Sequence, residues 1–106
     1  MLYELREYRI KTGCLTRWID VMESLVIPFQ REKGMDVVGS FVAVDVEDLY
    51  IWIRRFENES ERKRLYDLVY GSSYWNDTVR PAMGDMLLRE AKREVLMVPA
   101  GSSYLT

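Results

Sequence analysis

The segment Leu49 to Phe56, LYIWIRRF, constrains the fold most, because it alternates strictly between two sets of side chains. Successive side chains of a β-strand point to opposite faces, so this pattern predicts a strand. One face is aliphatic and is expected to be core: Leu49, Ile51 and Ile53. The other combines aromatic rings with a guanidinium: Tyr50, Trp52, Arg54 and Phe56. An unpaired guanidinium is costly to remove from water, so Arg54 requires a partner or a pocket.

A second alternating strand, Met1 to Ile10, supplies that partner. Its polar face carries Glu4, Arg6 and Tyr8. If the two strands are neighbours, Glu4 pairs with Arg54, Arg6 joins the network, and Tyr8 lies near Trp52. A solvated face of an open antiparallel sheet is the alternative. Several large rings on one exposed face would, however, mark an interface or a ligand site.

Composition describes one globular domain, residues 1–106, with a net charge of -2. Charges of both signs are interspersed without a basic stripe, so no nucleic-acid partner is expected. No apolar run reaches the length of a membrane span. A strand that starts at residue 2 leaves no room for a signal peptide, and we expect a cytoplasmic protein.

The chain contains no histidine and one cysteine, Cys14. Structural zinc, histidine-ligated haem and Ser-His or Cys-His nucleophiles are therefore excluded, and we expect no metal and no cofactor. Cys14 has no partner for an intramolecular disulfide.

The remaining chain predicts two helical regions and two more strands. Apolar residues at three- and four-residue spacing predict a helix capped by Thr12, interrupted at Pro28 and ended by Gly34. Residues 35–44 predict a strand with a bulge at Gly39, joined by an acidic turn to the strand that begins at Leu49. Asn58 predicts the start of a second helix that Gly71 ends. Its inward side chains are expected to be Leu65, Leu68 and Val69. A further helical piece interrupted by Pro81 and a strand over residues 88–98 complete the chain.

The order strand, helix, strand, strand, helix, strand predicts an α+β, ferredoxin-like fold with a four-stranded antiparallel sheet. In this arrangement the first and third strands lie together at the centre, and both helices cover one face. We expect the face with Tyr8, Trp52 and Arg54 to be uncovered. Two copies would then cover each other, which predicts a homodimer.

Several short motifs resemble the NIPSNAP family over nearly the whole chain: YELREY with Gly13 after it, WIRRF, YGSSYW, and Val98-Pro99-Ala100. The resemblance implies a dimeric α/β barrel in which two sheets enclose a cavity. It implies no reaction and transfers no catalytic residue. The chain departs from the family at Thr12, where proline is frequent, and in the doubled Arg54-Arg55.

Three functions fit these residues. The first is binding of a small anionic or aromatic ligand between the sheets, with this candidate site: Glu4, Arg6, Tyr8, Trp52, Arg54 and Phe56. The second is a cofactor-independent monooxygenase or isomerase for a small aromatic substrate, with Glu4 or Tyr8 assisting deprotonation. The third is a purely structural dimer with a closed ionic core made by Glu4, Arg6 and Arg54.

Overall fold

The computed structural model describes residues 1–101, and residues 102–106 of the predicted domain lie outside the described part. The strands are β1 (Leu2–Arg9), β2 (Asp36–Val42), β3 (Leu49–Phe56) and β4 (Arg93–Met97). The α-helices are α1 (Leu15–Val21), α2 (Ile27–Glu32), α3 (Glu59–Tyr70) and α4 (Arg80–Met83). Two π-helical turns, η1 (Met22–Val26) and η2 (Trp75–Val79), and one 3-10 turn, η3 (Arg89–Ala91), complete the elements.

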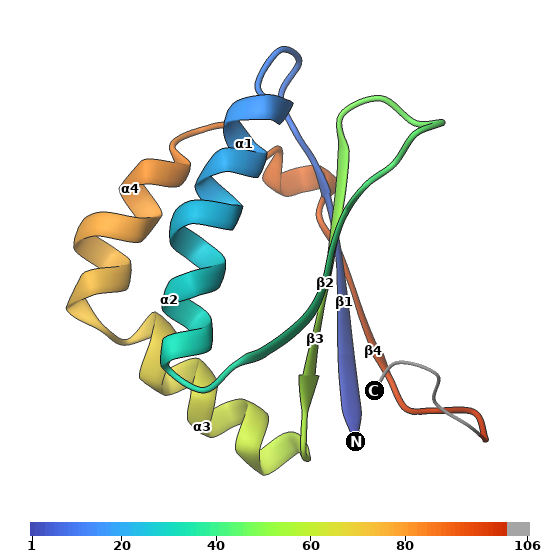
Figure 1. The fold of residues 1–106 in the computed structure, drawn as a ribbon, viewed down its shortest axis with the longest axis vertical. Helices are drawn as coiled ribbons and strands as arrows, with labels where there is room; N and C mark the ends of the chain where they lie inside the picture. The colour runs from blue at the N-terminus through green and yellow to red at the C-terminus, as the bar shows by residue number, and fades with distance from the viewer. Residues whose placement is uncertain (102–106) are drawn as a thin grey trace.

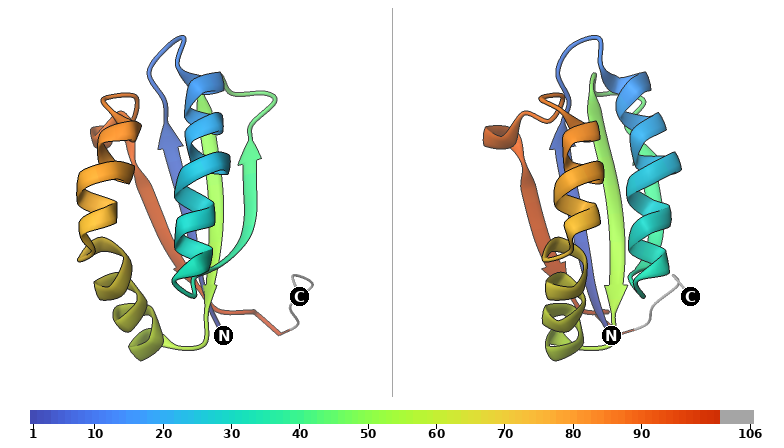
Figure 2. Two further views of the ribbon diagram at one scale, coloured as in Figure 1. Left: turned by 60° about the vertical axis from the view of Figure 1, so that its left-hand side comes forward. Right: turned by 90° about the vertical axis from the view of Figure 1, so that its left-hand side faces the viewer.

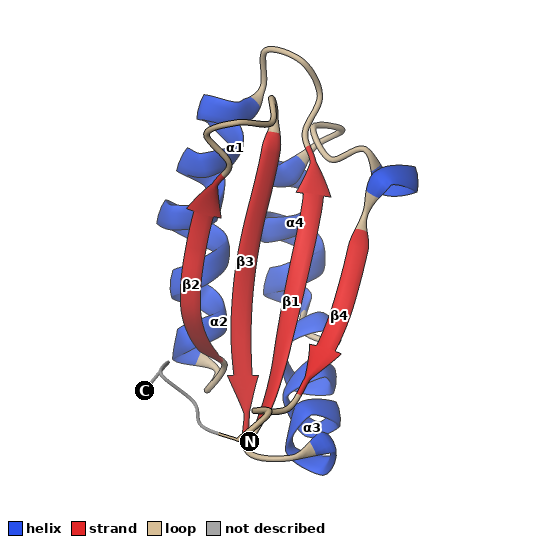
Figure 3. Cartoon of the chain, turned by 90° about the vertical axis from the view of Figure 1, so that its right-hand side faces the viewer, coloured by secondary structure: helices blue, strands red, loops and turns tan. Residues whose placement is uncertain are grey.

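The four strands form one antiparallel sheet in the order β2-β3-β1-β4. The central pair aligns Glu4 with Arg54 and Arg6 with Trp52. The predicted ferredoxin-like α+β fold and the adjacency of the first and third strands are therefore confirmed. The helices lie on one face of the sheet (Figure 1), and the other face is open (Figure 3).

Local signals set most element boundaries as expected. The Asn58 side chain accepts a hydrogen bond of 2.8 Å from the Glu61 backbone N–H, which satisfies one free donor at the start of α3. Gly34 follows α2 with φ +106°, a conformation that favours glycine. A register shift between Val37 and Gly39 confirms the bulge in β2. The predicted cap at Thr12 is wrong, because α1 begins at Leu15 with Cys14 before it.

Both prolines within the helical segments follow a π-helical turn. Pro28 lies in the first turn of α2, directly after η1, and Pro81 lies in the first turn of α4, directly after η2. Proline has no backbone N–H, so the helix loses one hydrogen bond at each position. The helical segments continue through both positions, with η1 leading directly into α2 and η2 into α4. Such π turns are frequent at functional sites.

The prediction of which sheet face is covered is wrong. Tyr8, Tyr50 and Trp52 are 5%, 1% and 3% exposed, and they belong to the same core cluster as Trp18 and Met22 on the first helical segment. Aromatic side chains bury more apolar surface than aliphatic ones, so packing the helices on the aromatic face removes more apolar surface from water. The aliphatic face of Leu49, Ile51 and Ile53, which was expected to be core, is the half-buried open face.

Two further expectations differ at the edges of the fold. Leu68 on α3 was expected to point inward but is 43% exposed, whereas Leu65 and Val69 on the same helix are buried. The last strand covers only Arg93–Met97, because a 3-10 turn occupies residues 89–91. Within residues 1–101, no helix has the length and apolar character needed to span a membrane.

Candidate functional site

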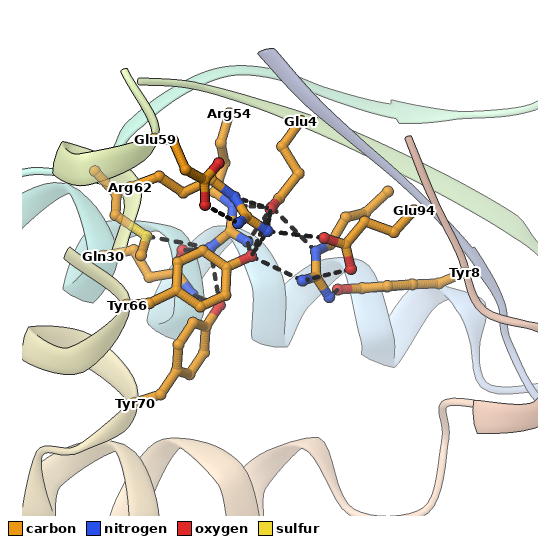
Figure 4. Close-up of polar contacts among 11 residues, drawn as sticks. Glu4, Tyr8, Gln30, Arg54, Glu59, Arg62, Tyr66, Tyr70 and Glu94 are labelled. Carbon is orange, nitrogen blue, oxygen red and sulfur yellow. Dashed lines mark hydrogen bonds and ion pairs between the residues drawn. The ribbon is translucent and has the colours of Figure 1, made fainter. Parts of the chain in front are cut away.

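An ion pair between the two central strands lies beneath the helices. Arg54 on β3 donates from Nε to Glu4 Oε1 on β1 over 3.1 Å, and its Nη2 contacts the same oxygen. Glu4 is 0% exposed and Arg54 is 1% exposed. The predicted Glu4 to Arg54 interaction is confirmed, and Figure 4 shows it at the centre of a larger cluster.

Helices α2 and α3 supply acceptors for the other Arg54 donors. Nη1 donates to Gln30 Oε1 and to the Tyr70 hydroxyl, each over 2.8 Å. Nη2 donates to the Tyr66 hydroxyl over 2.7 Å. Every side of the guanidinium is therefore used inside the protein, and Arg54 has no donor left for a ligand.

The Glu4 carboxylate is saturated in the same way. Arg62 Nη2 and the Tyr66 hydroxyl donate to Oε2 over 2.7 and 2.5 Å. Arg6 Nε donates to Oε1 over 3.1 Å. Burial alone raises the pKa of Glu4, but the Arg54 charge, the Tyr66 hydrogen bond and the Arg6 charge outweigh it and lower this pKa to about 2. Glu4 is ionised at neutral pH.

We expect acid to destabilise the protein through Glu4. Its pKa falls from an ordinary 4.5 to about 2 in the folded state, so its ionised form stabilises the fold above pH 4.5, and this contribution is lost as the pH falls toward 2. Urea denaturation should show the gap in unfolding free energy between the native protein and Glu4→Gln narrowing across this range. A gap that stays constant with pH would contradict the lowered pKa.

A cavity of about 210 Å³ lies beside this cluster, between the sheet and the helices. Arg6, Tyr8 and Trp52 contribute to it from the sheet. Its remaining lining comes from helical segments and the chain before β4: Met22, Val26, Tyr70, Trp75, Arg80, Met83, Leu87, Arg89 and Lys92. Both π turns contribute side chains, so the two proline-associated irregularities shape the same space. Figure 2 shows how the helical segments lie over the sheet.

The lining of this cavity carries positive charge only. Arg80, Arg89 and Lys92 are exposed, and within residues 1–101 none of them has a carboxylate at ion-pair distance. Arg6 differs, because it pairs with Glu4 and with Glu94 over 3.1 and 3.0 Å. No carboxylate is among the described lining residues.

The six candidate residues divide into two groups. Arg6, Tyr8 and Trp52 line the cavity. Glu4, Arg54 and Phe56 do not, and the Arg54 guanidinium lies 5.8 Å from the centre of the Phe56 ring. Arg6 joins the two groups, because it contacts Glu4 on one side and the Tyr8 hydroxyl on the other, over 3.3 Å.

The structure adds residues that the strand patterns did not indicate. Arg62, Tyr66 and Tyr70 complete the ionic cluster from α3. Their spacing of four residues places them on one helix face, so a polar aromatic stripe in α3 was a usable signal. The contributions of Gln30, Trp75 and Arg80 depend on how separate helical segments pack, which no local pattern shows.

The geometry defines a ferredoxin-like α+β protein with a buried ionic cluster and an adjoining cationic, aromatic cavity. The sequence model of the NIPSNAP family matches residues 3–103, and the chain belongs to that family. A NIPSNAP family protein with unknown function from Agrobacterium tumefaciens is similar, with 25% identity over 100% of this chain and 94% of that chain and a TM-score of 0.88.

More distant structures share the fold. An uncharacterized NIPSNAP domain protein from Burkholderia xenovorans is 19% identical over 94% of this chain and 95% of that chain, with a TM-score of 0.83. A putative antibiotic biosynthesis monooxygenase from Nitrosomonas europaea is 12% identical over 95% of this chain and 100% of that chain, with a TM-score of 0.70. Among curated proteins, no match was found.

Proposed function

We propose that this protein binds a small aromatic acid in the cavity between its sheet and its helices. The observation that carries the proposal is a cavity walled by aromatic rings whose charged lining residues are all cationic. The proposed ligand lies beneath the helices and not between two sheets; the core cluster that Tyr8 and Trp52 share with Trp18 and Met22 supports this location. Apolar pockets with a few convergent polar groups are the usual form of small-molecule sites.

The cavity volume sets the size of the ligand. A cavity of roughly 150 Å³ accommodates benzene. The volume of about 210 Å³ therefore suits a single ring with one or two short substituents. Trp52 and Trp75 offer aromatic surfaces to such a ring, and Met22 and Met83 offer adaptable apolar contacts.

The charges at the cavity favour an acid over a base. Arg80, Arg89 and Lys92 come together from α4 and from the chain around η3. Three cations around one opening attract an anionic group and repel a cationic one. Because all three are exposed, the effect is expected to weaken as salt is added.

Binding fits the site better than cofactor-independent oxygenation. Two proteins described as antibiotic biosynthesis monooxygenases, the first of them as putative, share the fold at 12% and 14% identity. Such a reaction requires a base, and neither proposed base suits it. Glu4 has a pKa of about 2 and does not line the cavity. Burial raises the pKa of the Tyr8 hydroxyl, so Tyr8 is neutral at pH 7.

The closed ionic core of the structural alternative lies within one chain, so the proposed homodimer uses other residues. The open face presents half-buried aliphatic side chains, namely Leu5, Leu49, Ile51, Ile53 and Val95. No described element covers this face (Figure 3). A second copy placed by a twofold axis would bury the same surface on both partners.

Benzoate and benzylamine test the binding proposal, because they share a ring and differ in the sign of charge. We expect benzoate to raise the melting temperature of the protein and benzylamine to leave it unchanged, since a ligand that binds only the folded state stabilises it. The variant Arg80→Gln/Arg89→Gln/Lys92→Gln should lose the benzoate shift.

Lys63→Gln is the matched control, because Lys63 is exposed on α3 and does not line the cavity. Its benzoate shift should equal that of the native protein. Stabilisation by benzylamine, or an unchanged benzoate shift in the triple variant, would rule out the cationic cavity as the acid site.

A further inference from the structure

Three hydrogen-bond donors lie together where the cavity meets the sheet. Building on the proposed aromatic acid, we infer that the natural ligand also carries a neutral hydrogen-bond acceptor opposite its acid group. That acceptor contacts Arg6, Tyr8 and Trp52. The ligand class is then a 4-substituted benzoate whose substituent is a carbonyl or a similar acceptor.

The indole of Trp52 provides the first evidence. Its Nε1 is buried and makes no hydrogen bond within the described residues. A buried donor without an acceptor costs free energy, so an orphaned N–H in a cavity wall indicates a group that arrives from outside the chain. Trp52 lines the cavity, which gives a ligand access to it.

Tyr8 and Arg6 add donors beside Trp52. The Tyr8 oxygen accepts from Arg6 Nη1 over 3.3 Å, while its own hydroxyl hydrogen has no acceptor among residues 1–101. Burial raises the pKa of Tyr8, and Arg6 and the Trp52 indole act in the opposite direction. The three side chains together form a donor cluster, which we call the donor floor.

Charge balance explains why the acceptor at the donor floor is neutral. The Arg6 charge is already matched by Glu4 and Glu94. A second anion beside them would be desolvated next to two carboxylates, which is costly. At the opening, Arg80, Arg89 and Lys92 have no such partners within the described chain. The acid group therefore lies at the opening and the neutral acceptor at the donor floor.

The placement of these groups favours substitution across the ring. The donor floor belongs to β1 and β3, whereas the cations belong to α4 and to the chain around η3. Rings and apolar side chains, including Trp75 and Met83, line the same cavity. A rigid single ring joins the two polar ends only when its substituents point in opposite directions.

Isothermal titration calorimetry with three ligands tests the inference. The matched pair is 4-acetylbenzoate and 4-isopropylbenzoate, which are similar in size; in the second a methyl group and a hydrogen replace the carbonyl oxygen. We expect 4-acetylbenzoate to bind about tenfold more tightly, the effect of roughly one added net hydrogen bond. Benzene-1,4-dicarboxylate, with an anion at both ends, should bind more weakly than 4-acetylbenzoate.

Trp52→Phe should move the affinity ratio of the matched pair toward one, and a ratio is insensitive to a general loss of affinity. Tyr8→Phe removes a second donor with a smaller change of shape. If Trp52→Phe fails to fold, the same move of the affinity ratio toward one in Tyr8→Phe supports the inference. Equal binding of the pair, or a preference for the dicarboxylate, overturns the inference but leaves the proposed aromatic-acid site intact. Absence of binding by all three ligands overturns both.

Discussion

Replacing Arg54 with methionine is expected to lower the free energy of unfolding by about 3–5 kcal/mol, the usual cost of breaking a buried ion pair from one side. The substitution leaves the Glu4 carboxylate buried without its direct cross-strand partner. It also removes the hydrogen bonds that Arg54 donates to Gln30 Oε1 and to the hydroxyls of Tyr66 and Tyr70. Urea denaturation followed by circular dichroism measures the loss.

A double-mutant cycle separates the pair from its surroundings. Glu4→Gln combined with Arg54→Met should cost clearly less than the sum of the two single variants, because neither charge is then left unpaired. Arg64→Met is the matched control, since its pair with Glu61 lies on the exposed side of α3, and we expect its stability to match that of the native protein. Additive losses in the cycle would show that Glu4 and Arg54 are not coupled.

Ile51→Glu is expected to convert the proposed homodimer to a folded monomer. Ile51 lies on the open face of the central strand β3, opposite Glu7 on β1 and Phe41 on β2. A carboxylate there would be buried against the second copy if the sheets meet, and a stable assembly needs roughly 1,000 Å² of buried surface. Light scattering should give twice 12.6 kDa for the native chain and 12.6 kDa for the variant.

Two comparison variants separate dissociation from unfolding. Val44→Glu changes a fully exposed residue outside the strands and should remain a dimer. Trp52→Glu places a charge beneath the helices and should unfold the protein instead of dissociating it. A native mass of one chain at micromolar concentration would show that the open face is not a dimer interface.

The sequence predicts strand pairing well because the evidence for pairing is local and chemical. Glu4 and Arg54 each require a partner, and their alternation patterns agree on a register that the structure has. Caps at Asn58 and Gly34 depend on the backbone of one turn and are equally readable.

The covered face was assigned wrongly because alternation shows which residues share a face but not which face meets the helices. Glu4 and Arg54 are ionisable, and this favoured the prediction that their face of the sheet is not covered by helices. The decisive partners, Tyr66 and Tyr70, come from α3, where their spacing alone does not reveal what they contact. A buried charge is tolerated when its hydrogen bonds are complete, and this completeness is a tertiary property.

The cavity could not be predicted for a related reason. Half of the predicted site, Arg6, Tyr8 and Trp52, does line it. Its remaining wall depends on two π turns, which offset the side chains that follow Met22 and Trp75 from their regular helical positions. Pro28 and Pro81 signal an interruption, but not the direction in which the helix accommodates it.

The most direct test of the proposed site is a titration of the ¹⁵N-labelled protein with benzoate, followed through the indole N–H signals of its 3 tryptophans. Trp52 and Trp75 line the cavity, whereas Trp18 is buried outside its lining and serves as an internal control. Substitution of each tryptophan by phenylalanine assigns the signals. The proposal predicts that the Trp52 and Trp75 signals move in a saturable manner while the Trp18 signal stays in place. Signals that do not move, or a shift of Trp18 alone, would contradict binding in this cavity.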